Sequence, residues 1–212
     1  MLAKGCLRIV AVPAVLALVS LLIAIWSAIP AIILFAVFTG ISVVFAIFFR
    51  DPERKIGQGI VSPADGLLTR AEATEAGAYF SIFMNIHDVH VNRAPWPGRV
   101  VEVRRVPGGH APAYRKKADR NERVVITLES SLGRILITQI AGVFARRIVT
   151  YVRAGQELSK GDRIGIIRFG SRVDLFVPAG WLKLRARRGE RVKAGSTTLA
   201  EAPGRGEGRG SR

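Results

Sequence analysis

Apolar residues fill the start of the chain, whereas polar and apolar residues alternate through most of its remaining length. Across Ile9–Phe49 no side chain carries a charge. At about 1.5 Å per residue, one helix of this length would span roughly twice the ~30 Å hydrocarbon core of a bilayer. Pro30 lies near the middle of the run, and proline usually ends or kinks a helix. The pattern therefore predicts a transmembrane hairpin within residues 1–49, made of two α-helices at about residues 9–28 and 31–49.

After Arg50 the dominant pattern is the alternation typical of β-strands. The segments "RVVITLES" (123–130) and "RILITQIAG" (134–142) flank the turn "SLG" and predict a β-hairpin. No long stretch there repeats its apolar residues at the helical period. Residues 50–200 are therefore expected to form one mainly β domain of antiparallel sheets. The tail at residues 201–212 has almost nothing apolar and is expected to be disordered.

Two segments of the β-rich part resemble each other. "VRAGQEL" begins at Val152 and "VKAGSTTL" begins at Val192. Each reads as a strand, a glycine turn and a second strand. The predicted fold is therefore a mainly β domain with barrel-sandwich-like halves, preceded by an α-helical transmembrane hairpin.

Basic residues flank the apolar run on both sides. Lys4 and Arg8 precede it, and Arg50, Arg54 and Lys55 follow it. Because basic flanks stay in the cytoplasm, the large remainder is expected on the cytoplasmic side of the cell (inner) membrane. A cleaved signal peptide would have an apolar region of only ~7–15 residues, far shorter than this run.

The chain has 32 Lys and Arg against 16 Asp and Glu, a net charge of +16. Such an excess indicates a polyanionic partner, either nucleic acid or the anionic inner leaflet. No helix-turn-helix, zinc-finger or aromatic RNA-binding motif accompanies it, so we expect a membrane partner and no nucleic acid. Cys6 is the only cysteine, which excludes an intrachain disulfide.

Two short motifs have ordinary explanations when taken singly. "FFRDPERK" (48–55) is compatible with a stop signal at the membrane, and "VSPADG" (61–66) with a turn. "FMNIHDVHVNRAPWPG" (83–98) is more informative, because it holds two of the three histidines. A zinc site would need further ligands, but Cys6 lies beside the membrane and His110 in a Gly-Pro loop. We therefore expect no metal site.

A fourth motif is "IIRFGSRVDLFVPAG", which interrupts an apolar strand pattern with Gly170 and Ser171. Glycine inside a strand packs against nothing, so it marks a bulge or a place where something approaches the backbone closely. The motif by itself leaves both explanations open.

Taken together, "FFRDPER", "SPADG", "NIHDVHVNRAP" and "RFGSRVDLFVPAG" resemble the short form of the phosphatidylserine decarboxylases in order and spacing. The resemblance covers nearly all of residues 48–200. It implies a zymogen that cuts its own chain between Gly170 and Ser171 and converts Ser171 into a covalent pyruvoyl cofactor. Many members have Leu-Gly-Ser-Thr at the cut, whereas this chain has Phe169 and Arg172 on either side of the pair. A second Gly-Ser at Gly195–Thr197 lacks the family's flanking residues.

The resemblance also implies a role for each candidate residue. Ser171 is the nucleophile of self-cleavage, His90 is its base, and Asp65 orients His90. His87 carries the acid–base work of decarboxylation. Arg93, beside the histidines, is a candidate for binding the substrate headgroup.

The implied reaction converts phosphatidylserine into phosphatidylethanolamine and CO2 through a Schiff base to the pyruvoyl group. The two cleaved chains are expected to stay together as a heterodimer, and the family suggests a homodimer of processed protomers. A pyruvoyl decarboxylase of another amino acid is an alternative, but the hairpin favours a lipid substrate. A lipoyl-like carrier would need a modifiable lysine, and neither Lys160 nor Lys183 lies in a carrier motif. A membrane-tethered binding module without activity would leave the paired histidines unexplained.

Overall fold

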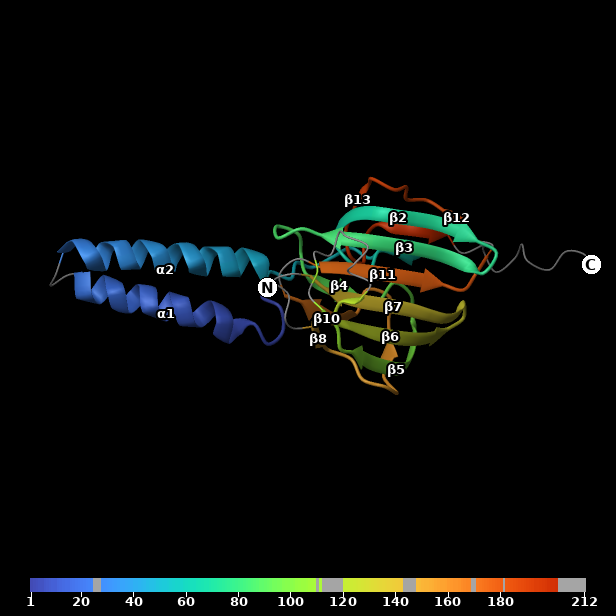
Figure 1. Ribbon diagram of the computed structural model, residues 1–212, viewed down its shortest axis with the longest axis horizontal. Coiled ribbons are helices and arrows are strands. Elements are labelled where there is room, and N and C mark those ends of the chain that lie inside the picture. The colour runs from blue at the N-terminus through green and yellow to red at the C-terminus, as the bar shows by residue number, and fades with distance from the viewer. Residues whose placement is uncertain are drawn as a thin grey trace, which may run out of the picture. The chain divides into compact units, whose positions relative to one another are not determined.

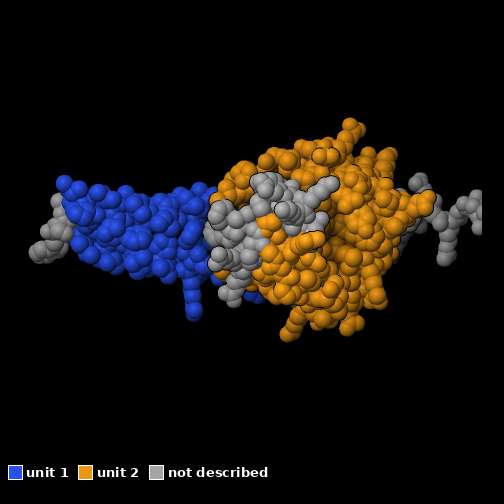
Figure 2. Space-filling model, viewed as in Figure 1, with its two compact units in different colours: residues 1–53 blue, residues 54–212 orange. Residues whose placement is uncertain are grey.

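The computed structural model (Figure 1) describes most of the chain. The described residues are 1–24, 28–109, 111, 120–142, 148–168, 171–180 and 182–201. They form two compact units, Met1–Glu53 and Arg54–Arg212, which Figure 2 distinguishes by colour. The expected disordered tail after residue 201 and the loop position of His110 lie outside the described residues.

The first unit is a pair of packed helices, α1 (Leu7–Ala24) and α2 (Ala28–Phe48). Pro13, Ala17 and Ser20 are the buried residues of α1, and they recur at helical spacing on one face. Small residues on a shared face let two apolar helices approach closely. Both helices are long and apolar enough to cross a membrane.

Helix α2 begins at Ala28, so Pro30 lies in its first turn instead of between the helices. Proline is tolerated in the first turn because the backbone N–H that it lacks would have no partner within the helix there. The turn expected at Pro30 is therefore wrong, because Pro30 lies within α2. Residues 25–27, between the two helices, are outside the described residues.

The described residues of the second unit form strands in three antiparallel sheets, and Figure 1 shows how these strands are arranged. The strands are β1 (Ile60–Val61), β2 (Gly66–Thr74), β3 (Gly77–Met84), β4 (Val91–Arg93), β5 (Gly98–Val106), β6 (Arg123–Ser130), β7 (Gly133–Ala141), β8 (Ile148–Thr150), β9 (Glu157–Leu158), β10 (Arg163–Ile167), β11 (Ser171–Val177), β12 (Lys183–Leu184), β13 (Arg191–Val192) and β14 (Thr198–Glu201). The largest sheet has eight strands in the order β13-β2-β3-β11-β7-β6-β5-β9. The other two sheets of the described residues have three strands each, in the orders β4-β10-β8 and β1-β14-β12. The predicted fold class, a mainly β domain after a pair of apolar helices, is confirmed.

Strand β11 lies inside the large sheet, between β3 and β7. Along it, alternate side chains from Ser171 to Val177 are buried, and on β3 the same holds from Ala78 to Met84. Because side chains alternate between the faces of a strand, these buried rows make one face of the sheet the wall of the core. Ser171 is the first residue of its row.

The predicted hairpin is confirmed, with β6 and β7 paired from Arg123 with Ile140 to Ser130 with Gly133. The two similar segments are arranged differently from each other. Each turns at a glycine with positive φ, Gly155 and Gly195. The first leads into β9 of the large sheet, and the second into β14 of a small one.

Candidate active site

Ser171 begins β11 and is fully buried. In the sheet its neighbours are Met84 at the end of β3 and Ala141 at the end of β7. The Ser171 Oγ is buried and has no hydrogen-bond partner among the described residues. Leaving a buried hydroxyl unsatisfied costs about 1–3 kcal/mol, so such an atom in a native structure calls for an explanation.

The chain changes sheets just before Ser171. Strand β10 ends at Ile167 in the β4-β10-β8 sheet, whereas β11 belongs to the eight-stranded sheet. Phe169 and Gly170 lie outside the described residues. The bond predicted to be cut therefore lies at the connection between two strands of different sheets.

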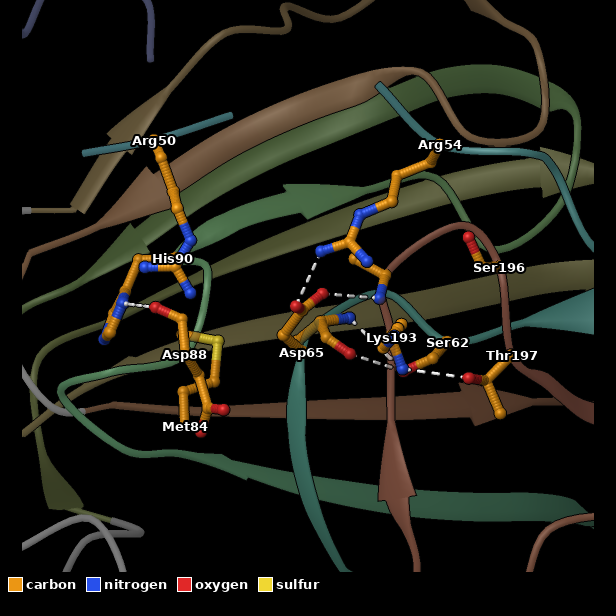
Figure 3. Close-up of polar contacts among 12 residues, drawn as sticks. Arg50, Arg54, Ser62, Asp65, Met84, Asp88, His90, Lys193, Ser196 and Thr197 are labelled. Carbon is orange, nitrogen blue, oxygen red and sulfur yellow. Dashed lines mark hydrogen bonds and ion pairs between the residues drawn. The ribbon is translucent and has the colours of Figure 1, made fainter. Parts of the chain in front are cut away.

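His90 lies beside this connection, immediately before β4, and its side chain is fully buried. Its backbone oxygen accepts a hydrogen bond from the N–H of Ile167 at 3.4 Å. Its Nδ1 lies 2.8 Å from the carbonyl oxygen of Asp88 (Figure 3). A carbonyl oxygen only accepts, so Nδ1 carries the proton, and the lone pair of a neutral ring is on Nε2. This tautomer allows His90 to act as a base through Nε2.

The segment between β3 and β4, residues 85–90, is held by Asp88. Its Oδ2 accepts a hydrogen bond from the backbone N–H of Asn85 at 2.8 Å, and its Oδ1 forms an ion pair with Arg191. The Nη2 of Arg191 also lies 3.3 Å from the Nε2 of His87. The side chain of Asp88 is 9% exposed, whereas those of His87 and Arg191 are 60% and 58% exposed. The same short segment therefore exposes His87 and buries His90.

Asp65 lies in the turn before β2, in a separate group of contacts in Figure 3. Its Oδ2 pairs with the guanidinium of Arg54 at 2.7 Å, and its Oδ1 accepts from the backbone N–H of Ala194 at 2.8 Å. Burial raises the pKa of Asp65, against the opposing effects of the Ala194 N–H and the Arg54 charge. The contacts thus join Asp65 to Arg54, and His90 to the Asp88 carbonyl.

The second Gly-Ser sequence forms an ordinary turn. The Oγ of Ser196 donates to the carbonyl of Lys55 at 2.9 Å, and the Oγ1 of Thr197 accepts from the N–H of Lys193 at 2.9 Å. Both hydroxyls therefore have structural partners, in contrast to that of Ser171.

Arg93, the candidate for binding the substrate headgroup, is buried and hydrogen-bonded within the protein. It belongs to β4 and is 6% exposed. Its Nη1 donates to the carbonyl of Gly161 at 3.1 Å, and its backbone N–H donates to Pro63. The first contact ties β4 to the turn before β10, and the second ties it to the turn before β2.

Two buried amide side chains, one on β4 and one on β7, lie near Ser171. Gln139 of β7 donates from Nε2 to the Oδ1 of Asn92 at 2.7 Å, and both side chains are fully buried. The Nδ2 of Asn92 contacts the Sδ of Met84 at 3.5 Å. Since Met84 is the neighbour of Ser171 in the sheet, the amides connect the two sheets close to the point where the chain passes between them.

A family model, described as phosphatidylserine decarboxylase, matches residues 41–200. The chain belongs to the phosphatidylserine decarboxylase family. A relative of this decarboxylase from Archaeoglobus fulgidus, named a putative archaetidylserine decarboxylase proenzyme, is 50% identical over 163 residues, which are 76% of this chain and 80% of the relative. A phosphatidylserine decarboxylase proenzyme from Streptomyces coelicolor is 49% identical over 154 residues, 72% of this chain and 70% of the relative.

Membership confirms the resemblance found in the four motifs and makes the protein a decarboxylase, which is a carboxy-lyase. Both relatives are named proenzymes, a name that implies self-processing. The alternative of a binding module without activity is therefore set aside.

Sequence reasoning on this decarboxylase missed Asp88, Arg191 and the amide pair of Asn92 with Gln139. Asp88 carries a local signal, because it stands between the two histidines in "HDVH". Arg191 carries none, since it is one arginine among many and lies 103 residues from Asp88 along the chain. The amides lie in strands whose pattern indicates only burial.

Proposed function

We propose that this decarboxylase cleaves itself between Gly170 and Ser171 and then decarboxylates a phospholipid with a serine headgroup. The observation that carries the proposal is the buried Ser171 Oγ without a hydrogen-bond partner among the described residues, at a change of sheets. The buried His90 ring, with its lone pair on Nε2, supports the same conclusion. A pyruvoyl group formed from Ser171 fits this setting, because the residue begins a strand that neighbours on both sides hold in place.

Self-cleavage begins with an exchange of bonds at the Gly170 carbonyl. The Oγ of Ser171 gives its proton to Nε2 of His90 and attacks the carbonyl carbon. An ester bond to Oγ forms, the amide C–N bond breaks, and His90 returns the proton to the freed amine. Glycine at position 170 places no side chain in the path of the attack.

The second stage removes the α-proton of residue 171 and breaks its bond to the ester oxygen. The chain before it leaves with Gly170 as a free carboxylate, and residue 171 becomes dehydroalanine. Addition of water and loss of ammonia leave a pyruvoyl group at the start of the second chain. Once formed, this group supplies an electron-poor carbonyl that binds the substrate amine and takes up the electrons left when CO2 departs.

Asp65 supports His90 through its charge in this proposal. The buried carboxyl of Asp65 and the buried ring of His90 belong to the two motifs that the family resemblance assigns to self-cleavage. In this role the negative charge of Asp65 stabilises the protonated ring of His90 during the attack. Arg54 and Ala194 hold it in position.

His87 delivers the proton that replaces CO2 on the substrate's α-carbon. Its exposed side chain, beside the guanidinium of Arg191, is accessible to a substrate from outside the domain. The products are then CO2 and an ethanolamine phospholipid, which is phosphatidylethanolamine if the substrate is phosphatidylserine.

The membrane position is part of the proposal. Helices α1 and α2 are long and apolar enough to cross a bilayer. Basic residues lie at the start of α1 and after the end of α2, so the catalytic domain is proposed to face the cytoplasm. The named relatives differ in the lipid, phosphatidylserine or archaetidylserine, but share the serine headgroup. We propose phosphatidylserine for this chain, and activity on vesicles of each lipid distinguishes the two.

Intact mass measurement of the purified full-length protein tests self-cleavage. We expect one chain that ends at Gly170 and another of residues 171–212 whose first residue is pyruvoyl, because Ser171 is the only serine proposed to attack. Ser171→Ala is expected to stay uncut. Ser196→Ala is the matched control, since it alters the other Gly-Ser sequence, and it is expected to be cut normally. A wild-type chain that is uncut and still decarboxylates phosphatidylserine would end the proposal.

A further inference from the structure

We propose that Asp88 and Arg191 form a positioning pair that sets the ring tautomers of both active-site histidines. Residues 85–90 are called the histidine loop. The proposal rests on the roles proposed for His87 and His90, and it adds the residues that keep each ring in its working form. In this proposal both partners act through the histidines and not on the reacting atoms.

Asp88 acts on His90 through the backbone. Its carbonyl oxygen receives the Nδ1 proton of His90 at 2.8 Å, so the direction of this carbonyl decides whether the bond forms. The carboxylate of the same residue is bound on both sides, by the N–H of Asn85 at 2.8 Å and by the guanidinium of Arg191. These contacts fix residue 88 at both its carboxylate oxygens. The Asp88 carbonyl is therefore held toward His90, and the lone pair of the neutral ring is kept on Nε2.

Arg191 acts on His87 directly. Its Nη2 lies 3.3 Å from the Nε2 of His87, and a guanidinium only donates hydrogen bonds. The Nε2 must therefore accept, which leaves the proton of a neutral ring on Nδ1. The competing carboxylate oxygen of Asp88 is farther from this nitrogen, at 3.8 Å. The two histidines are thus both held with the proton on Nδ1, by two different partners.

The anchor of the pair is the large sheet. Arg191 belongs to β13, where it is paired with Leu67 of β2, and Leu67 is paired with Phe83 of β3. Phe83 stands next to the last residue of β3, where the histidine loop begins. Pairing across the sheet therefore aligns the backbone of Arg191 with the end of β3, from which the histidine loop continues.

The two residues of the pair also lie on opposite sides of the predicted cleavage site in the sequence. Asp88 precedes Gly170 in the chain and Arg191 follows it. After cleavage the ion pair would join the two product chains beside the active site. The fragment that carries the pyruvoyl group would then also supply the arginine that orients the histidine loop of the other fragment.

The first experiment measures self-cleavage of the full-length protein on a gel over time. We expect Asp88→Asn and Arg191→Gln each to slow cleavage by about tenfold to a hundredfold, the range found when a hydrogen-bond partner that orients a metal-binding histidine is lost. The double variant is expected to match the slower single variant, because the two residues act as one unit. Arg191→Lys keeps the charge and is expected to restore most of the rate.

Arg185→Gln is the matched control. Arg185 also pairs with a carboxylate in the segment after the cut, that of Glu201 at 2.6 Å. It is expected to cleave at the wild-type rate. If Arg185→Gln loses as much rate as Arg191→Gln, or if the losses from Asp88→Asn and Arg191→Gln add in the double variant, the positioning pair is overturned.

The second experiment observes the tautomers themselves. The chain has three histidines, so ¹⁵N-histidine labelling of the full-length Ser171→Ala protein in detergent gives three assignable rings. His87 and His90 are expected to carry the proton on Nδ1, and Asp88→Asn or Arg191→Gln to give mixed tautomers. Unchanged ring signals in both variants would overturn the inference. This measurement needs no cleavage, so it separates failure of the pair from failure of the proposed function.

Discussion

The two neighbouring histidines differ more in their surroundings than in their sequence context. His90 is fully buried, whereas the side chain of His87 is 60% exposed. A buried base is suited to a buried nucleophile such as Ser171, and an exposed ring to a substrate that arrives from outside. The proposed division of work between self-cleavage and decarboxylation rests on this difference in burial.

Replacing each histidine separately tests the division. We expect His90→Ala and Asp65→Ala to accumulate uncut chain, because Ser171 loses its base or the charge that supports the base. His87→Ala is expected to be cut into two chains but to decarboxylate about 10²- to 10⁴-fold more slowly, since it loses a proton donor. A gel of the purified protein measures cleavage, and CO2 release from phosphatidylserine vesicles measures turnover.

His110→Ala is the control, since it removes the remaining histidine. It is expected to be cut and to turn over as the wild type does. The roles are reversed if His87→Ala stays uncut while His90→Ala is processed.

At the scale of elements, strand β11 carries different groups on its two faces. Its buried row begins with Ser171, and the opposite face presents Arg172 and Asp174. The Nη2 of Arg172 pairs with the Oδ2 of Asp174 at 2.9 Å, and these side chains are 15% and 30% exposed. Many members of the family have threonine where this chain has Arg172. Asp174 neutralises the charge that the arginine brings next to the cut.

Removing this arginine is expected to destabilise the sheet. Arg172→Thr leaves the carboxylate of Asp174 without its cation, and the Oδ1 of Asp174 is already buried with no hydrogen-bond partner among the described residues. We expect the free energy of unfolding to fall by about 1–3 kcal/mol, between the values for exposed and buried pairs. Urea unfolding in the uncut Ser171→Ala background measures it.

The double variant Arg172→Thr with Asp174→Thr is expected to recover most of this loss, because no unpaired charge remains. Arg185→Thr breaks the exposed pair with Glu201, whose partners are 48% and 44% exposed, and is expected to cost less. An equal loss in Arg172→Thr and Arg185→Thr would contradict the role given to Asp174.

At the scale of the whole molecule, the chain combines an apolar helix pair with a strongly basic domain. Only Lys4 and Arg8 of the basic residues precede Arg50, and none of the acidic ones does. The second unit has a hydrophobic core of its own, drawn from residues between Ile60 and Ala200. The proposed position at an anionic membrane therefore has two separate supports, the helices and the charge.

A protein that starts at Arg50 lacks the helices but keeps the basic domain, so it separates the effect of the helices from that of the charge. It is expected to fold and to cut itself, because every residue proposed for processing lies after that point. Its activity on phosphatidylserine vesicles is expected to fall and to decrease steeply with added salt. Electrostatic attraction contributes about 1 kcal/mol for each basic residue near the surface and decays over a Debye length of ~8 Å at physiological salt.

The full-length enzyme is the comparison, and its activity is expected to depend much less on salt. Vesicle assays of both proteins across a salt series measure the difference. Equal activity and equal salt response would mean that the helices do not serve to present the active site to lipid.

The sequence alone determined the fold class, the family and the helix pair. Each of these depends on local spacing: alternation of apolar residues marks a strand, an uncharged run marks a membrane helix, and four motifs in a given order mark the family. Such signals are visible in a single chain because a side chain's face is set by its near neighbours in the sequence.

Only the tertiary structure decided which residues meet. The partner of Asp88 lies 103 residues away, and Ala194, which binds Asp65, lies 129 residues away. The setting of Arg93 and the change of sheets before Ser171 likewise depend on strand order. Pairing between distant strands is governed by the packing of the whole core, which leaves no periodic signal at any one of these positions.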